Sequence, residues 1–210
     1  MANVLKSGFR PIGTLSGSPL PKPLVRPVAN NYGTALGIYD VVAQTTDGTT
    51  IVGAAATAGA ILGVATGFSY VTQGKRIQSN YLPANTTFSP TTVGSLNESL
   101  VEFIPLTPDV ICEVQCDDAT TATTIAGYNA LVGENCDIAA GTANSTTGIS
   151  GQLLDISTHA TATFNFRIIQ IPSYSLETNK QVINDPASIY FRVWVVCNES
   201  IWPTGTATGV

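Results

Sequence analysis

Apolar and polar residues alternate along several stretches of the chain, which is the pattern of half-buried β-strands. The clearest stretches are 35–45, 110–116, 164–168 and 189–197. In 110–116 the valines and cysteines share one face of the predicted strand, and Glu113 and Gln115 lie on the other. Repeated alternation of this kind predicts a mainly antiparallel sheet structure.

One apolar stretch has two possible structures. Residues 51–68 carry no charge, and Gly59, Gly63 and Gly67 have the GxxxG spacing of packed membrane helices. The stretch is mostly Ala, Gly and Thr, however, and lacks the large apolar residues that drive membrane insertion. A strand over 60–72 places its large apolar side chains on one face: Leu62, Val64, Phe68 and Tyr70. Gly63 and Gly67 then lie on the other face, where another backbone can approach closely.

Turn-forming residues divide the rest of the chain into short segments. The 210 residues include 12 Pro and 19 Gly, which favour short strands over long helices. Helix is indicated only at Ser95 and Glu98, which have capping-box spacing, and at residues 124–132. The sequence therefore predicts an all-β fold, an antiparallel β-sandwich or barrel with at most two short helices. Its body is expected to be a single unit over residues 34–210.

Charges are few and unevenly distributed. Charged residues make up 11% of the chain, against about a quarter in an average soluble domain. Residues 1–39 hold four basic residues and no acid, whereas the remainder holds all 14 acidic residues. The net charge of −5 argues against a general DNA or RNA binder, which needs a basic balance.

The first 33 residues are predicted to form an extended, basic, proline-rich arm. The run from Pro19 to Pro23 cannot form a helix or an inner strand, because proline lacks the backbone N–H and fixes φ. A flexible terminus would explain the prolines, but the apolar residues between them favour an arm that lies along a partner. The residues expected to contact that partner are Lys6, Phe9, Arg10, Pro11, Leu20, Lys22 and Arg26.

The chain offers few residues for catalysis. His159 is the only histidine, and it lies in a polar stretch without a nucleophile motif such as GxSxG. No P-loop and no GxGxxG motif is present. The acidic residues are scattered, so no carboxylate pair stands out for hydrolysis. The sequence therefore predicts that the protein is not an enzyme and holds no cofactor.

Metal ligands and disulfides are not indicated by the spacing of the cysteines. Cys112 and Cys116 lie about 13 Å apart along an extended strand, which is too far for a disulfide. With Cys197 they are interpreted as small core side chains, and zinc ligation lacks a CxxC pair. Asp117-Asp118 with Asp155 could hold Ca²⁺, although no EF-hand pattern is present.

Short motifs along the chain resemble, in their order, a group of tailed-bacteriophage virion proteins encoded near the major capsid protein. These are described as head decoration, cement or minor capsid proteins. The motifs that carry the resemblance are MAN at 1–3, GFRP at 8–11, YGTA at 32–35, YDVV at 39–42, LGVATGF at 62–68, SNYLP at 79–83, DVICEVQ at 109–115, LDIS at 154–157, FRIIQI at 166–171 and TGV at 208–210. Residues 93–106 and 139–151 match no part of that pattern.

The resemblance implies a structural protein that binds the outside of the phage capsid and cements neighbouring capsid subunits. Its partners would be the major capsid protein and copies of itself, as a trimer or dimer on the capsid, with no nucleic acid and no membrane. It would assemble in the host cytoplasm and reside on the outer surface of the virion. The alternative is a carbohydrate- or receptor-binding β-sandwich module, for which exposed aromatic residues such as Trp202 would form a platform.

Overall fold

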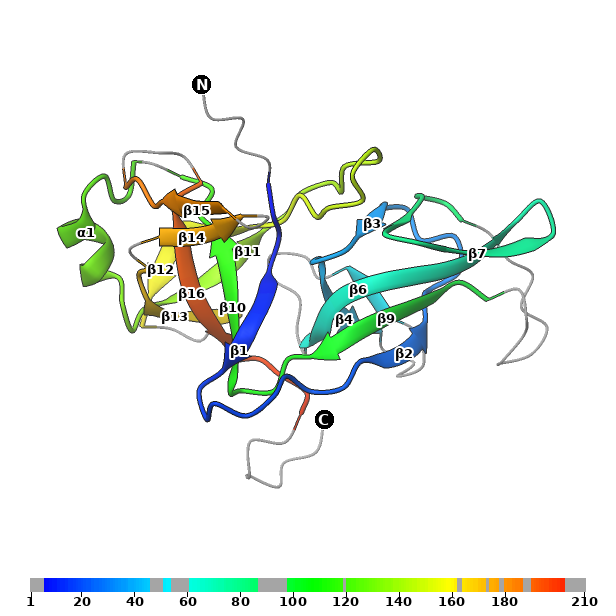
Figure 1. Ribbon diagram of the computed structural model, residues 1–210, viewed down its shortest axis with the longest axis horizontal. Coiled ribbons are helices and arrows are strands. Elements are labelled where there is room, and N and C mark those ends of the chain that lie inside the picture. The colour runs from blue at the N-terminus through cyan, green and yellow to red at the C-terminus, as the bar shows by residue number, and fades with distance from the viewer. Residues whose placement is uncertain are drawn as a thin grey trace.

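The structure is a computed structural model of the chain, and it describes residues 6–45, 51–53, 61–86, 98–118, 120–161, 164–172, 174–177, 180–186 and 190–202. Strands dominate this part of the chain, and the paired strands run antiparallel. They form two main sheets that lie side by side (Figure 1). The predicted all-β, antiparallel fold is confirmed.

The first main sheet, called sheet one, curls around the larger core. In spatial order its strands are β1 (Arg10–Thr14), β10 (Val110–Gln115), β16 (Arg192–Cys197), β13 (Phe166–Gln170), β11 (Asn135–Ala139) and β12 (Leu153–Ala160). A bridge between Cys116 and Leu154 brings the end of β10 back to β12, so the sheet curls into a half-barrel. A separate hairpin consists of β14 (Tyr174–Glu177) and β15 (Lys180–Ile183).

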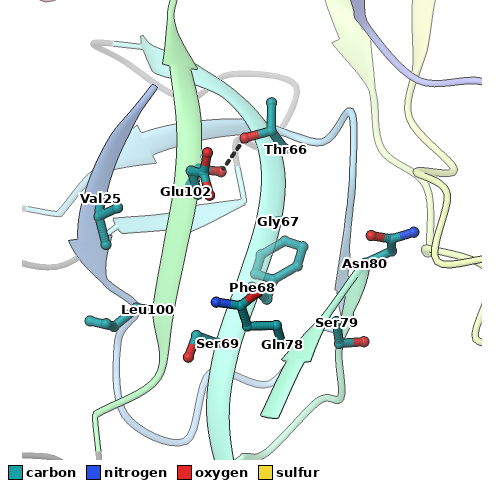
Figure 2. A pocket seen from close by; sticks show the side chains of 10 residues that line it. All are labelled: Val25, Thr66, Gly67, Phe68, Ser69, Gln78, Ser79, Asn80, Leu100 and Glu102. Carbon is teal, nitrogen blue, oxygen red and sulfur yellow. Dashed lines mark hydrogen bonds between the residues drawn. The ribbon is translucent and has the colours of Figure 1, made fainter. Parts of the chain in front are cut away.

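The second main sheet, called sheet two, is built around one long strand. Its strands in order are β2 (Leu24–Pro27), β9 (Leu100–Pro105), β6 (Ile61–Thr72), β4 (Val41–Gln44) and β5 (Ile51–Gly53). Strand β7 (Lys75–Ser79) also pairs with β6, and β3 (Leu36–Gly37) pairs with β8 (Tyr81–Leu82). A groove of 440 Å³ crosses the β2, β9, β6 and β7 strands (Figure 2).

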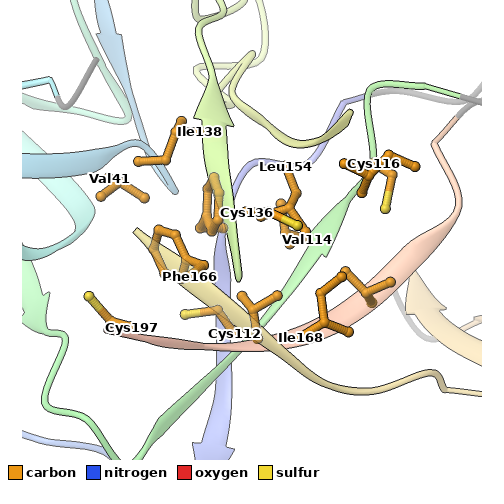
Figure 3. Packing of buried hydrophobic residues seen from close by; sticks show 14 of the residues in the cluster. Val41, Cys112, Val114, Cys116, Cys136, Ile138, Leu154, Phe166, Ile168 and Cys197 are labelled. Carbon is orange, nitrogen blue, oxygen red and sulfur yellow. The ribbon is translucent and has the colours of Figure 1, made fainter. Parts of the chain in front are cut away.

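Two clusters of buried apolar residues hold the sheets together. Cluster one fills sheet one and includes Val41 and Val64 from sheet two, so it joins the two sheets (Figure 3). Cluster two lies against the opposite face of sheet two and contains Val42 and Leu62. The inner strands of sheet two are therefore buried on both faces, which explains their nearly unbroken apolar sequence.

The strand over residues 60–72 is confirmed, but its predicted face is partly wrong. Leu62 and Phe68 belong to cluster two, whereas Val64 belongs to cluster one. The register of β6 shifts against β4 and shifts again between Ala65 and Gly67 against β9. Each extra residue reverses the side to which the following side chains point, so simple alternation fails here.

The helix predictions had different outcomes. Residues 124–132 contain helix α1 (Ile125–Ala130), and the Thr124 hydroxyl caps it by accepting the Gly127 N–H at 3.1 Å. Ser95 lies outside the described residues, and Glu98 precedes strand β9 rather than starting a helix. The stretch 35–45 is divided into β3 and β4, because Tyr39 between them adopts a left-handed φ of 70°.

The four cysteines are buried side chains of cluster one (Figure 3): Cys112, Cys116, Cys136 and Cys197. All are free thiols, and burial raises the pKa of each one. The interpretation of Cys112, Cys116 and Cys197 as core residues is confirmed. Such thiols behave as small apolar groups, because the thiolate needed for reaction is disfavoured in the core.

The N-terminal segment is extended, as predicted, but it is not an arm that stands apart from the body. Strand β1 pairs with β10 and strand β2 pairs with β9, so residues 10–27 belong to both main sheets. Phe9 has no exposed surface and stacks on Phe166, with ring centroids 4.5 Å apart. The predicted boundary at residue 33 is therefore wrong, because prolines exclude only inner strands, and these are edge strands.

Candidate functional site

Residues 10–27 form a continuous edge, here called the edge ribbon. Arg10 lies opposite Glu113 in β1, and Leu24 lies opposite Phe103 in β2. Since β9 and β10 follow each other in the chain, the ribbon runs antiparallel along both of them. It is the outermost strand of sheet one and of sheet two at once, and it faces the viewer and the lower side in Figure 1.

The edge ribbon concentrates exposed apolar side chains. Six large hydrophobic residues are exposed in the described part of the chain, and four of them lie on the ribbon. These four are Ile12 (38%), Leu15 (60%), Leu24 (41%) and Val25 (59%). The other two, Ile125 and Val132, lie at helix α1. Leu24 and Val25 are adjacent in β2, so their side chains point to opposite faces of the ribbon. Exposed apolar side chains concentrated on one segment in this way indicate an interaction site.

Positive charge accompanies these apolar side chains. Lys6 and Lys22 are exposed, while Arg10 and Arg26 are half-buried within β1 and β2. No acidic residue occurs before Asp40, so the ribbon carries only basic charges. The segment therefore differs in both charge and polarity from the acidic, Thr- and Ser-rich remainder of the chain.

The structure separates the seven predicted contact residues into two groups. Phe9 is fully buried, and Leu20 packs partly buried against cluster one, so both hold the ribbon in place. Lys6, Arg10, Pro11, Lys22 and Arg26 are exposed or half-buried along it. The side chains with the largest exposed apolar surface, Leu15 and Val25, were not among the seven, because sequence alone does not tell which apolar residue faces the core.

Prolines limit how another chain can use this edge. Pro11 and Pro27 lie within β1 and β2, and three more lie between or beside them at 19, 21 and 23. A proline has no N–H to donate, so an edge rich in proline is a poor template for a further strand. The edge is therefore better suited to contacts through side chains than to extension of the sheet by another strand.

A buried polar junction fixes the start of the ribbon to the body. Asp40 is 2% exposed and accepts hydrogen bonds from the Gly37 N–H at 2.7 Å and from the Ser150 hydroxyl. Gly8 lies directly against this junction with a φ of +63°, and a Cβ there would lie 2.6 Å from the Tyr39 carbonyl oxygen. Only glycine fits at that position, because both conformation and space exclude a side chain.

The junction makes stability depend on pH. Burial raises the pKa of Asp40 from 3.8 to about 6, partly opposed by its hydrogen bonds. The native state therefore holds this proton more tightly than the unfolded state, and ionisation destabilises the fold. Stability from this group is complete below pH 4 and is lost as the pH rises through about 6, by roughly 3 kcal/mol in total.

Urea unfolding across this pH window tests that expectation. Burial also raises the pKa of Asp117 and Asp137, so the measured quantity is the difference between the wild type and Asp40→Asn. In the variant the decline attributable to residue 40 should be absent. Equal pH dependence in both proteins would show that Asp40 is not protonated in the native state at pH 5.

In the described part of the chain, the acidic side chains and His159 do not form a metal site. Asp118 is half-buried and accepts hydrogen bonds from Thr120 and Thr121, which lower its pKa to about 2. Within the described residues, no group of three or more His, Cys, Asp or Glu is arranged to hold a metal ion, so the suggested Ca²⁺ site with Asp155 has no geometric support. His159 is exposed on β12.

No protein-family model, curated protein or solved structure matches the chain. Among the residues that the structure describes, no helix combines the length and the apolar composition needed to cross a membrane. The edge ribbon is therefore the candidate functional site on geometric grounds alone.

Proposed function

We propose that the protein is a structural component of a phage virion, which binds the outside of the capsid and cements neighbouring capsid subunits. The observation that supports this is the edge ribbon, where four of the six exposed large hydrophobic residues coincide with a segment that carries only basic charges. A surface of this composition suits a protein partner, since interface cores favour apolar side chains and arginine.

Energetics favour a role that depends on many copies. Full burial of a leucine or valine side chain stabilises a contact by about 1.5–3 kcal/mol, before the cost of association. Leu15 and Val25 are the most exposed of the four ribbon residues, so they have the most surface to lose to a partner. Contacts of this size are modest for one copy, but they add up when copies that also contact each other engage one shell.

The charge of the ribbon indicates what kind of capsid surface it would bind. A basic ribbon favours an acidic or neutral capsid surface, and Lys22 and Arg26 would steer the encounter. Copies of this protein, arranged as a trimer or dimer around a capsid symmetry axis, would place several ribbons on adjacent capsid subunits. The proposal assigns no catalytic step to any residue.

A double substitution on the ribbon tests the proposal. Leu15→Ser/Leu24→Ser removes two exposed side chains, 60% and 41% accessible, and should leave the core intact. We expect its affinity for particles that lack the protein to fall by about tenfold or more, measured as occupancy after reconstitution. Filled particles carrying this variant should also lose DNA at a lower temperature than particles carrying the wild type.

The other two exposed hydrophobic residues provide a matched control. Ile125→Ser/Val132→Ser removes side chains that are 46% and 42% accessible but lie at helix α1. This control should bind particles like the wild type. Equal occupancy of both double variants would refute the ribbon as the docking surface, and particles that are equally robust without the protein would refute the cement role.

A further inference from the structure

The groove across sheet two contains a glycine with open space at the position of a side chain. Gly67 lies in the middle of β6 and forms part of the groove lining. Its φ is not left-handed, and a Cβ built on it would meet no atom within 4 Å. Neither conformation nor packing therefore demands glycine, although glycine in a strand costs roughly 0.5–1 kcal/mol relative to alanine. Gly67 borders the register shift of β6 against β9, and strand glycines occur both at such shifts and where a ligand or another backbone approaches closely.

Polar side chains without partners surround this bare backbone (Figure 2). In the described part of the chain, the side chains of Gln78, Asn80 and Glu102 form no hydrogen bond, and all three line the groove. Val25 and Leu100 lie at the left side of the view and Asn80 at the right. The groove thus combines amide and carboxylate groups with an aliphatic edge around an open floor.

The lining excludes several classes of ligand. Glu102 is the one charged residue among the described lining residues, and it is negative, so phosphate, sulfate and nucleotide ligands are disfavoured. The basic residue Arg76 lies beside the groove, where it donates a hydrogen bond to the lining Ser69 hydroxyl at 2.9 Å. The volume of 440 Å³ lies within the range of about 300–1,000 Å³ that is usual for small-molecule sites. An extended peptide would need apolar pockets for alternate side chains, and the groove has apolar side chains chiefly at its β2 and β9 side.

We infer that the groove binds a neutral carbohydrate. A sugar ring has hydroxyl groups on its edge and C–H groups on its faces. The Gln78 and Asn80 amides and the Glu102 carboxylate would exchange hydrogen bonds with the hydroxyl groups, and Leu100 would contact the C–H face. The backbone at Gly67 would form the floor, so a ring could lie directly on the strand.

Titration with neutral oligosaccharides tests the inference. The probes are maltohexaose, cellohexaose, chitohexaose and mannohexaose, each at millimolar concentration, with binding followed by calorimetry and by amide NMR shifts. We expect at least one probe to bind and to shift the amides of β6 and β7. Gly67→Val should weaken binding by about tenfold or more, because the new side chain occupies the floor of the groove. Gln78→Ala should also weaken it.

A second strand glycine supplies a matched control. Gly13 lies on β1 at a register shift, has no left-handed φ, and also has open space at its Cβ position. Gly13→Val should therefore leave sugar binding unchanged. Failure of every probe to bind, or equal affinity of Gly67→Val and the wild type, would overturn the inference. Capsid occupancy should be unaffected by Gly67→Val, so this result is independent of the ribbon experiment.

Discussion

Replacing Phe9 by alanine is expected to lower the free energy of unfolding by about 3–5 kcal/mol. The side chain has no exposed surface, and its ring stacks on Phe166 at 4.5 Å and 28°. Its backbone N–H also donates to the Tyr39 carbonyl oxygen at 2.9 Å, which holds the residue next to the buried junction. Alanine would keep this backbone hydrogen bond but would leave a cavity in cluster one. Urea unfolding at fixed pH measures the loss.

Leu15→Ala is the control for this measurement, because it shortens an apolar side chain in the same segment that is 60% exposed. Its effect should stay within about 0.5 kcal/mol. A loss below about 1 kcal/mol for Phe9→Ala would mean that the N-terminal segment is not part of the cooperative fold. In that case, deletion of residues 1–28 would leave a folded body. We expect instead that this deletion abolishes cooperative unfolding, because it removes β1, β2 and Phe9 together.

The second large effect is expected at a buried ion pair on sheet one. Arg192 and Glu113 pair at 3.2 Å with side chains only 6% and 7% exposed, and Trp194 donates its indole N–H to the same carboxylate at 3.4 Å. Burial lowers the pKa of Arg192, and the nearby Glu113 carboxylate opposes that change. Glu113→Ala would remove this carboxylate from the buried guanidinium. We expect a loss of about 3–5 kcal/mol in the free energy of unfolding.

Substituting both members of the pair distinguishes the effect of the lost charge on stability from the effect of the lost side-chain volume. The double variant Glu113→Met/Arg192→Met removes both charges and fills similar volume, so its loss should be much smaller than that of Glu113→Ala. Glu102→Ala, on the neighbouring sheet, removes an exposed carboxylate and should change stability by no more than about 0.5 kcal/mol. Equal losses for the single and double variants would show that volume, rather than an unpaired charge, sets the cost.

Local patterns predicted the strands well where apolar and polar residues alternate without a register shift. The alternation over 110–116 correctly placed its valines and cysteines in the core, since side chains of a strand point alternately to its two faces. The same reasoning failed in β6, where register shifts near Leu62 and Thr66 change the side to which later residues point. A register shift depends on the partner strand, and the residues of one strand do not reveal it.

The candidate site was predicted by its composition but not by its geometry. The basic, proline-rich character of residues 1–33 indicated an interaction segment, and its exposed residues are consistent with that hypothesis. Its detachment from the body was predicted wrongly, because proline restricts the backbone of a residue without showing whether the other side of the strand is paired. The groove at Gly67 was indicated only as a place for close backbone approach, since its walls at β2 and β9 come from strands far from β6 in the chain.

The sequence by itself determined the all-β class, a short helix within residues 124–132 and the burial of Cys112, Cys116 and Cys197. These follow from alternation, capping and composition, which act over a few neighbouring residues. Only the tertiary structure decided that residues 10–27 close the edge of both sheets, that Asp40 meets Ser150, and that the groove forms around Gly67. Each of these depends on pairing between residues far apart in the chain, where register and packing, rather than local preference, select the contact.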